Sequence, residues 1–473
     1  MSILSTILAY ADSSPDKVAV FEKEIPKTYA QLANDIQSAA HQLRDRNVQA
    51  GEYVLIVSVN NYAFICIYFA AHLVGATAVN IAADVDDAYR QFVIDRTQPS
   101  LCIEDCAAFI QASECKTAFS VSEVKETDIA DLMFTSGATG EPKGVMLSHR
   151  QLVEATEHII GQIQNTPDDV ELLLMPMSHS FGMGRMRTTL YAGGTLVLGY
   201  PLQRLKGVFK AIERHKITGL GLVPSAWAFI VQMSKNKIAT FAPQLNYIEF
   251  GSAHLPAADK KLLTAWFPQT RIVMHYGLTE VSRAVFTHLH TDNHDSAGNL
   301  SRGAEVAIIR KNGALAAPGE EGEIALKAPW MMTGYYKEPD LTTEAFVEGY
   351  FRTGDLGKIE GDSLFLTGRL KEIINVGGKK VSPYQIEDVL NKSEIVNESA
   401  CIALPDKDMG EVVQAFVVLE TDPLLEANKA TERLKEIAAQ HLPVHMRPHK
   451  YNYVVSLPKT ASGKIQRMKL GSG

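Results

Sequence analysis

Apolar positions in the first half of the chain alternate between helical and strand-like spacing. A helix is predicted over residues 28–46 by apolar residues three or four positions apart, namely Tyr29, Leu32, Ile36, Ala40 and Leu43. The continuous apolar run at 53–59 then predicts a buried strand. Strand-like runs recur at 172–175, 195–198 and 218–223, separated by helical patterns at 203–214 and 225–235. This alternation predicts an α/β fold with a largely parallel sheet covered on both faces.

The pattern changes after about residue 302. Short β-rich runs punctuated by Gly, Pro and Asn predict a small β-barrel-like subdomain. Beyond Arg369 a separate α+β pattern follows, with helices near 383–391 and 425–440 and strands near 398–404 and 411–419. We therefore expect a large N-terminal domain of layered αβ subdomains over residues 1–369 and a small C-terminal domain over 370–470.

Length, charge and cysteine usage narrow the class of protein. The chain has 473 residues, more than one small barrel or bundle contains, and its 46 Lys and Arg against 54 Asp and Glu give a net charge of −8. This charge disfavours nucleic acid as a partner. The most apolar stretch, 62–79, is too short for a membrane span and predicts a buried helix and strand. Five sparse cysteines favour a reducing, cytoplasmic location and predict no structural zinc site.

The sharpest local signal is the loop Phe-Thr-Ser-Gly-Ala-Thr-Gly-Glu-Pro-Lys-Gly at 134–144, which follows a strand-like run at 130–133 and precedes a helical pattern at 149–160. Glycine backbone, hydroxyl groups and one lysine together offer the close donors and the positive charge that phosphate oxygens need. A Walker loop is disfavoured because Lys143 is followed by glycine. The candidate phosphate-binding residues are Thr135, Ser136, Gly137, Thr139, Gly140 and Lys143.

This loop resembles the serine/threonine/glycine-rich signature of the acyl-adenylate-forming superfamily, which includes acyl-CoA synthetases, peptide-synthetase adenylation domains and beetle luciferases. Further segments resemble the other signatures in order and spacing, over nearly the whole chain. They are a degenerate first signature at 27–32, then His-Tyr-Gly-Leu-Thr-Glu at 275–280, Tyr-Phe-Arg-Thr-Gly-Asp-Leu at 350–356, Gly-Arg-Leu-Lys-Glu at 368–372 and Leu-Pro-Lys-Thr-Ala-Ser-Gly-Lys at 457–464.

The resemblance implies that a carboxylic acid and ATP form an acyl-adenylate and pyrophosphate, after which a thiol takes the acyl group. Adenylation brings anions together, so fixed cations and donors should supply much of the catalysis. By its match to the family's last signature, Lys464 is expected to bridge the carboxylate and the phosphoryl oxygens. The resemblance likewise assigns Thr279 to the α-phosphate and Glu280 to Mg²⁺ bound with ATP, an ion that prefers oxygen ligands.

The same resemblance also implies which residues bind the nucleoside and which belong to the hinge and the thiol-transfer loop. For adenine and ribose it implies Gly251, Ser252, Ala253, Tyr276, Gly277, Asp355 and Arg369. Lys371 matches the hinge about which a mobile C-terminal domain rotates, and Gly377 and Gly378 match the loop that this rotation brings to the acyl-adenylate for thiol transfer.

Three residues are candidates for the acyl pocket: His179, Ser180 and His275. Ser180 stands where amino-acid-activating members carry an aspartate, which disfavours an α-amino acid. His275 stands where synthetases of long acids often carry glycine, which indicates a short or medium, or polar, acid. Arg185 and Arg187 lie just beyond; we expect a solvated helix face there, with pairing to a second carboxylate of the substrate as the alternative.

The sequence thus predicts an ATP-dependent, AMP-forming acid–thiol ligase with ATP and Mg²⁺, and with coenzyme A as the preferred thiol. One alternative is a stand-alone enzyme that loads the phosphopantetheine arm of an acyl carrier protein. Another is a nonenzymatic acid- or nucleotide-binding descendant, which the presence of Lys143, Glu280, Asp355 and Lys464 disfavours. A luciferase-like oxygenation is a third, with no residue that favours it.

Overall fold

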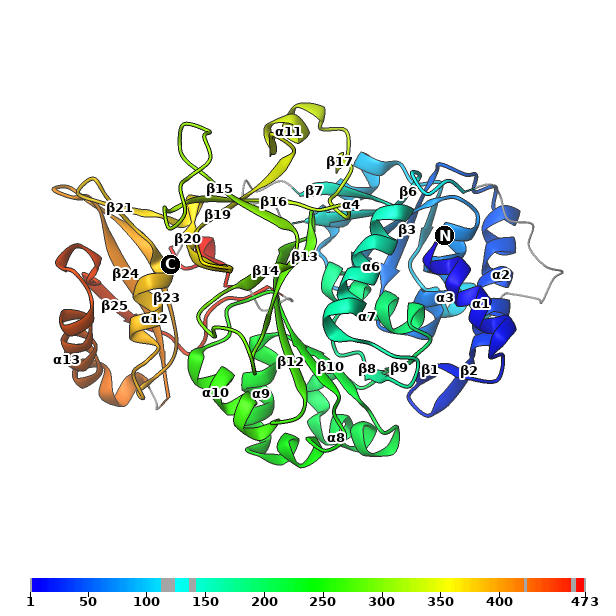
Figure 1. The fold of residues 1–473 in the computed structure, drawn as a ribbon, viewed down its shortest axis with the longest axis horizontal. Coiled ribbons are helices and arrows are strands. Elements are labelled where there is room, and N and C mark those ends of the chain that lie inside the picture. The colour runs from blue at the N-terminus through cyan, green and yellow to red at the C-terminus, as the bar shows by residue number, and fades with distance from the viewer. Residues whose placement is uncertain (1, 112–123, 136–141, 421–422, 461–464, 472–473) are drawn as a thin grey trace. The chain divides into compact units, whose positions relative to one another are not determined.

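The computed structural model describes residues 2–111, 124–135, 142–420, 423–460 and 465–471 (Figure 1). The chain divides into two compact units. The first contains Met1–Glu305 and Leu326–Phe351, and the second contains Val306–Ala325 and Arg352–Gly473. The expected domain boundary after residue 369 stays a prediction.

A mixed six-stranded sheet forms one part of the first unit, in the order β17-β7-β6-β4-β3-β5. Its strands are β3 (Tyr53–Ser58), β4 (Thr77–Ala82), β5 (Leu101–Ile103), β6 (Ile129–Thr135), β7 (Lys143–Ser148) and β17 (Gly334–Tyr335). The four strands β3 to β6 are parallel, and β7 pairs antiparallel with both β6 and β17. Helix α3 (Tyr62–Leu73) is buried along its whole length, as its almost entirely apolar sequence predicts.

The part of the 14-stranded sheet from β14 onward belongs to this unit and has the order β14-β13-β12-β11-β10-β8-β9-β1-β2. Its strands are β1 (Val18–Glu22), β2 (Ile25–Thr28), β8 (Val170–Leu172), β9 (Thr195–Leu198), β10 (Gly219–Leu222), β11 (Tyr247–Phe250), β12 (Arg271–Leu278), β13 (Ser282–His288) and β14 (Gly298–Gly303). The six strands from β12 to β1 in this order are parallel, and β13, β14 and β2 are antiparallel to their neighbours.

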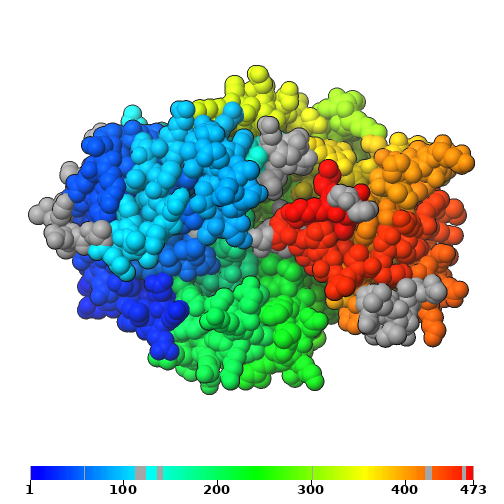
Figure 2. Space-filling model, turned by 180° about the vertical axis from the view of Figure 1, so that it is seen from behind, coloured from blue at the N-terminus to red at the C-terminus, as the bar shows by residue number. Residues whose placement is uncertain are grey.

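Helices cover both faces of this second sheet because successive strand residues point to opposite sides. Ile248 and Phe250 of β11 pack in one core with α8 (Leu205–Arg214), α9 (Pro224–Ser234) and α10 (Ala257–Trp266). Tyr247 instead packs with α6 (His149–Ile163) on the other face. The remaining helices of this unit are α1 (Ile3–Ser13), α2 (Tyr29–Asp45), α4 (Asp87–Thr97), α5 (Cys106–Gln111), α7 (Ser180–Tyr191) and α11 (Pro339–Glu344). In Figure 2 the blue N-terminal residues lie beside the green residues of this sheet region, consistent with the pairing of β1 and β9.

The second unit contains a hairpin and a five-stranded sheet. The hairpin pairs β19 (Tyr350–Glu360) with β20 (Ser363–Arg369). The sheet has the order β22-β21-β24-β23, with β25 beside β24. Its elements are β21 (Ile374–Val376), β22 (Lys379–Val381), α12 (Pro383–Leu390), β23 (Val396–Asp406), β24 (Gly410–Leu419), α13 (Pro423–His441) and β25 (Lys450–Tyr453). Two further strands, β15 (Glu305–Ile309) and β16 (Gly322–Lys327), span the sequence boundaries between the units.

The predicted α/β class is confirmed, and most predicted elements form close to their expected bounds. The strand expected at 172–175 ends at Leu172, and β8 begins earlier, at Val170. None of the helices in the described part of the chain has the length and apolar composition that a bilayer crossing requires.

Candidate active site

The phosphate-loop candidate joins two antiparallel strands. Thr135, the last residue of β6, lies opposite Lys143, the first residue of β7. The expected order of strand, loop and helix therefore needs correction: β7 intervenes, and α6 begins only at His149. Residues 143–148 pair with β6, and Val145 and Met146 also pair with β17 on the other side, so this segment is a strand of the sheet. Ser136, Gly137, Thr139 and Gly140 lie outside the described residues.

Tyr335 connects this loop to Glu280 in the signature at 275–280. Its hydroxyl donates a hydrogen bond of 2.8 Å to Oε1 of Glu280, and Nζ of Lys143 lies 5.1 Å from the centroid of its ring. Burial and the neighbouring carboxylate raise the pKa of Tyr335, so the hydroxyl keeps its proton and donates. Sequence reasoning missed Tyr335, because only the pairing of β17 with β7 brings it to this place.

Thr279 and Glu280 lie in the tight connection between β12 and β13. The amide of Val281 donates to the carbonyl of Leu278 over 3.1 Å, and Glu280 is 9% exposed. Gly277 precedes this turn, where a Cβ atom would lie 1.8 Å from the carbonyl oxygen of Ser282. Only glycine fits the hairpin at this position, so the glycine of the motif has a structural reason.

The expected adenine-binding segments meet at one sheet edge. Strands β11 and β12 are parallel neighbours, so Gly251, which follows β11, lies beside His275. A Cβ atom on Gly251 would be 2.1 Å from the His275 ring. The next residue, Ser252, has a left-handed φ of +73°, a conformation that is costly for a non-glycine residue and that occurs often at functional sites. Ala253 follows, while Tyr276 and Gly277 continue β12 from His275.

The candidate acyl-pocket residues are linked through Phe181. His179 is the N-cap of α7 and Ser180 is its first residue, and both are partly exposed. The ring of Phe181 packs edge-on against His275, with 4.9 Å between ring centroids. The structure therefore brings together two segments that lie almost a hundred residues apart in the sequence.

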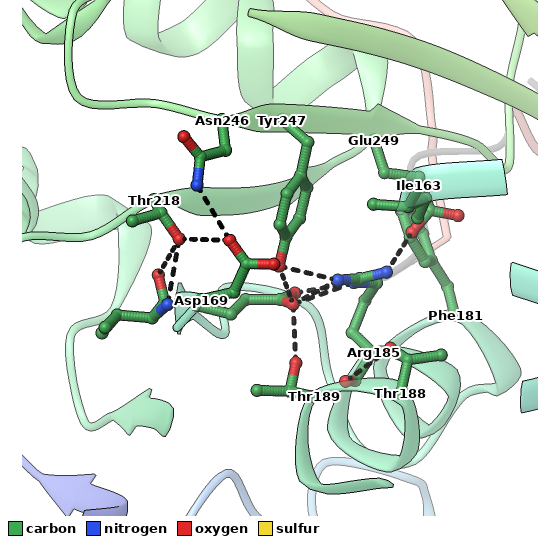
Figure 3. Close-up of polar contacts among 12 residues, drawn as sticks. Ile163, Asp169, Phe181, Arg185, Thr188, Thr189, Thr218, Asn246, Tyr247 and Glu249 are labelled. Carbon is green, nitrogen blue, oxygen red and sulfur yellow. Dashed lines mark hydrogen bonds and ion pairs between the residues drawn. The ribbon is translucent and has the colours of Figure 1, made fainter. Parts of the chain in front are cut away.

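Beneath these residues lies a buried network of charged side chains (Figure 3). Glu249 on β11 is fully buried, with Nδ1 of His275 2.7 Å away and Nε of Arg283 2.6 Å away. Arg185 contacts Glu249 through Nη1 at 3.2 Å and donates from Nε to Glu171 at 2.8 Å. Two positive and two negative side chains thus balance each other around His275.

Arg185 and Arg187 therefore correct the expectation of a solvated helix face. Their exposed fractions are 0% and 4%. Arg187 pairs with Asp131 of β6 at 2.8 Å, and Asp131 also contacts His72 at 3.0 Å. Helix α7 is buried against strands that carry these carboxylates, so each guanidinium finds a partner within the protein. The missed signal was the single acidic residue in each of the apolar strands β6, β8 and β11, because a buried carboxylate needs a cation.

The electrostatics of this network determine the protonation of His275. Burial alone would raise the pKa of Glu249, but Arg283 and His275 hold it well below its usual value. Burial lowers the pKa of His275 despite the attraction of Glu249. At neutral pH the pair is thus an ionised carboxylate and a neutral imidazole, with Nδ1 of His275 lying next to Glu249.

The side chains around Glu280 suit a magnesium ion that is bound together with a nucleotide, rather than a metal ion held by several protein ligands. Within the described ranges, no three His, Cys, Asp or Glu side chains are grouped to hold a metal. A Mg²⁺ ion at Glu280 would take its other ligands from phosphate oxygens and water, as this ion commonly does.

The second unit holds the other candidates. Nε of Arg369 lies 2.7 Å from Oδ1 of Asp355, directly across the β19–β20 hairpin. Lys371 is exposed in the short 3₁₀ helix η3 (Leu370–Glu372). Gly377 and Gly378 form the exposed turn between β21 and β22, with left-handed φ values of +56° and +81°. Lys464 lies outside the described residues.

Comparison with protein families gives two matches. The model of the AMP-binding enzyme family matches residues 8–336. The model of the AMP-binding enzyme C-terminal domain matches residues 385–464.

Three curated relatives illustrate the range of similarity. The peroxisomal OPC-8:0-CoA ligase 1 of Arabidopsis thaliana is 27% identical over 94% of this chain and 88% of its own. The sulfoacetate–CoA ligase of Cupriavidus necator is 32% identical over 72% of this chain and 66% of its own. The D-alanine–D-alanyl carrier protein ligase of Bacillus licheniformis is 27% identical over 99% of both chains.

Two solved structures share the fold. The anthranilate CoA ligase AuaEII in complex with anthranoyl-AMP has a TM-score of 0.90 and 21% identity, over 100% of this chain and 97% of its own. The o-succinylbenzoate coenzyme A synthetase of Bacillus subtilis in complex with ATP and a magnesium ion has a TM-score of 0.85 and 23% identity, over 98% of both chains.

Proposed function

The chain belongs to the family of AMP-binding enzymes and is an AMP-forming acid–thiol ligase, and we propose that it joins a short or medium, or polar, non-amino acid to coenzyme A. In the first step the acid's carboxylate attacks the α-phosphorus of ATP and pyrophosphate leaves. In the second step the thiol sulfur attacks the acyl carbonyl and AMP leaves. The observation that carries this proposal is the contact of Lys143, Tyr335 and Glu280 beside the hydroxyl-rich loop.

We assign the phosphates to this end of the site. Thr135 and the loop residues Ser136, Gly137, Thr139 and Gly140 would donate to phosphate oxygens, and Lys143 would add a positive charge. Tyr335 donates a hydrogen bond to Oε1 of Glu280 and would thereby hold the carboxylate in place to bind Mg²⁺. When bound, the ion neutralises phosphate charge and so favours the approach of a carboxylate. Thr279 would reach the α-phosphate, and Lys464 would bridge the carboxylate and the phosphoryl oxygens.

The remaining candidate residues would bind the nucleoside or act in the second step. Tyr276 offers a flat face to adenine, with Gly251, Ser252, Ala253 and Gly277 around it. Asp355 would accept hydrogen bonds from the ribose hydroxyls, and Arg369, which already pairs with it, would donate to them. Lys371 would be the hinge. Gly377 and Gly378, which form an exposed turn, would approach the acyl-adenylate during thiol transfer.

His275 supports a short acid as the substrate. Phe181 packs against one side of its ring, and the Gly251 backbone and Glu249 hold it from other sides. A side chain restrained in this way cannot swing aside easily to open a long tunnel. His179 and Ser180 would complete the walls, and Ser180 lacks the negative charge that would pair with an α-ammonium group.

A chain-length series tests this assignment. We expect pyrophosphate release to be greatest with acids of two to about eight carbons or with polar acids, and small with palmitate. His275→Gly should shift the preference toward longer acids, because it removes the imidazole ring. His290→Gly is the matched control, since the His290 ring lies elsewhere, against the carbonyls of Phe267 and Thr270. A preference for palmitate in the wild type would contradict the proposed substrate class.

The thiol acceptor and the location are also part of the proposal. Coenzyme A ligases predominate among the relatives, while the carrier-protein ligase supports an acyl carrier protein as the second candidate. We place the protein in the cytoplasm because the cysteines in the described part of the chain, Cys66, Cys102, Cys106 and Cys401, are free thiols.

A further inference from the structure

An ion pair of buried residues supports His275, a candidate wall of the acyl pocket, and Phe181, which packs against it. Oε1 of Glu249 lies 2.7 Å from Nδ1 of His275. The guanidinium of Arg283 lies 5.0 Å from the centroid of the Phe181 ring, and its Nη2 atom donates to the carbonyl of Phe181 over 3.2 Å. Because Nε of Arg283 also lies 2.6 Å from Oε1 of Glu249, each ring contacts one member of the same ion pair.

This ion pair continues into a second one (Figure 3). Arg185 contacts Oε2 of Glu249 through Nη1 at 3.2 Å and donates from Nε to Glu171 over 2.8 Å. The hydroxyls of Tyr247 and Thr189 each donate to Oε2 of Glu171 over 2.8 Å. The four charged side chains of the network are between 0% and 3% exposed, so water screens their charges very little.

Glycines leave room for both guanidinium side chains. A Cβ atom on Gly184 in α7 would lie 2.1 Å from Nη1 of Arg283. A Cβ atom on Gly221 in β10 would lie 3.2 Å from Cγ of Arg185. The two cations are thus closely packed between α7 and the sheet, and they are not free to turn toward a ligand.

We propose, on the basis of the acyl pocket and the substrate class proposed above, that this balanced network selects acids whose far end, opposite the reacting carboxylate, carries no negative charge. Each guanidinium already contacts a carboxylate of the protein, so neither offers an unpaired positive charge to a second carboxylate or a sulfonate of the substrate. Such a group would leave water near Glu249 without a compensating cation, which is costly. Glu249 is therefore a specificity-determining residue, and the substrate is a short or medium acid with an uncharged far end.

Matched pairs of acids test this selection in the wild-type protein. Butyrate is compared with succinate, hexanoate with adipate and benzoate with terephthalate by ATP–pyrophosphate exchange at about pH 7.5, where carboxylates are ionised. In the pair that contains the best substrate, we expect kcat/KM of the monoacid to exceed that of its diacid by about tenfold or more. A preferred diacid would overturn the selection while leaving the ligase activity in place. No exchange with any of the six acids would instead contradict the proposed substrate class, and this selection with it.

Glu249→Gln should weaken the selection. It keeps the size of the side chain but leaves Arg283 and Arg185 with only Glu171 to balance them, so a net positive charge arises behind the pocket wall. We expect the diacid-to-monoacid ratio of kcat/KM to rise about tenfold or more, because buried opposite charges couple strongly. The double variant Glu249→Gln with Arg283→Met removes one charge of each sign and should return the ratio to within about threefold of the wild type.

Asp131→Asn separates an effect of charge near the pocket from damage to the core. Asp131 is as buried as Glu249 and pairs with Arg187 of α7, and its other contacts are His72 and Tyr68. This control should lower the melting temperature without moving the ratio by more than about twofold. An unchanged ratio in Glu249→Gln, or an equal rise in both variants, would overturn the role of Glu249. If Glu249→Gln does not fold, the wild-type preference within the matched pairs decides.

Discussion

At the scale of single residues, the site depends on side chains that hold the candidate functional groups rather than on those groups alone. Glu280 was expected from its motif, yet its orientation comes from Tyr335, more than fifty residues later. His275 was expected as a pocket wall, yet its protonation follows from Glu249 and its position from Phe181. The motifs supply the candidate groups, whereas the partners that hold these groups depend on strand pairing that local sequence does not encode.

Tyr335→Phe should weaken Mg²⁺-dependent adenylation. The change removes the hydrogen bond to Glu280, and a bond to a charged group typically contributes about 1.5–3 kcal/mol. We expect a higher Mg²⁺ concentration at half-maximal pyrophosphate release and a rate about tenfold lower at saturation. Tyr336→Phe is the matched control, because the neighbouring Tyr336 packs against Tyr53 instead. Equal effects of the two variants would contradict a specific role for Tyr335.

Acidification should destabilise the first unit through its buried histidines. Burial, helped by Arg283, lowers the pKa of His158 to about 4 from an ordinary value near 6.5. The folded state therefore binds this proton less readily than the unfolded state. The contribution to stability is present above pH 6.5 and is lost as the pH falls from 6.5 toward 4, by about 2 kcal/mol at pH 5.

Urea unfolding between pH 7.5 and 5 measures this loss. His158→Phe should flatten the pH dependence while keeping a ring stacked on Trp330, from which the His158 ring centroid is 4.1 Å distant. His41→Phe is the comparison, since His41 lies on the partly exposed face of α2. A pH dependence identical in the wild type and in His158→Phe would contradict the assignment.

At the scale of elements, the β12–β13 hairpin and the β6–β7 hairpin place the two central signatures. Periodicity predicted β3, β9 and β10 and the helices α2, α8 and α9 well, because their apolar positions follow strand or helix spacing. It did not predict β7, where Lys143–Ser148 has the length of a turn and becomes a strand only through pairing on both sides. It also misread α7, because two arginines on a helix look solvated until the carboxylates of the neighbouring strands are known.

Gly277→Ala should disrupt the β12–β13 hairpin and with it the placement of Thr279 and Glu280. The added Cβ atom would lie 1.8 Å from a backbone oxygen, which cannot move without distorting the turn. We expect pyrophosphate release to fall by more than about tenfold. Gly161→Ala in α6 meets no atom within 4 Å and should leave activity unchanged and stability equal or slightly higher. Activity retained in Gly277→Ala would contradict the role given to this turn.

At the scale of the whole molecule, the first unit carries the phosphate and adenine candidates, and the second unit carries the ribose, hinge and thiol-transfer candidates. The sequence was sufficient for the fold class and for the family, because six segments resemble the family's signatures in the expected order. It was insufficient for the acid, because the pocket walls come from segments far apart in the chain and their packing determines the available volume. The charge network below His275 belongs to this scale as well, since it joins β8, β11, β13 and α7.

The central claim is acid-dependent adenylation followed by transfer to a thiol. The most direct measurement is ATP–pyrophosphate exchange with a panel of acids graded in length, aromaticity and charge, for the wild type and Lys464→Ala, followed by mass-spectrometric detection of the thioester with coenzyme A or a carrier protein. We predict exchange with one class of short or polar acids, its loss in Lys464→Ala, and an acyl-coenzyme A product. A folded wild-type protein that supports no exchange with any acid would contradict the account.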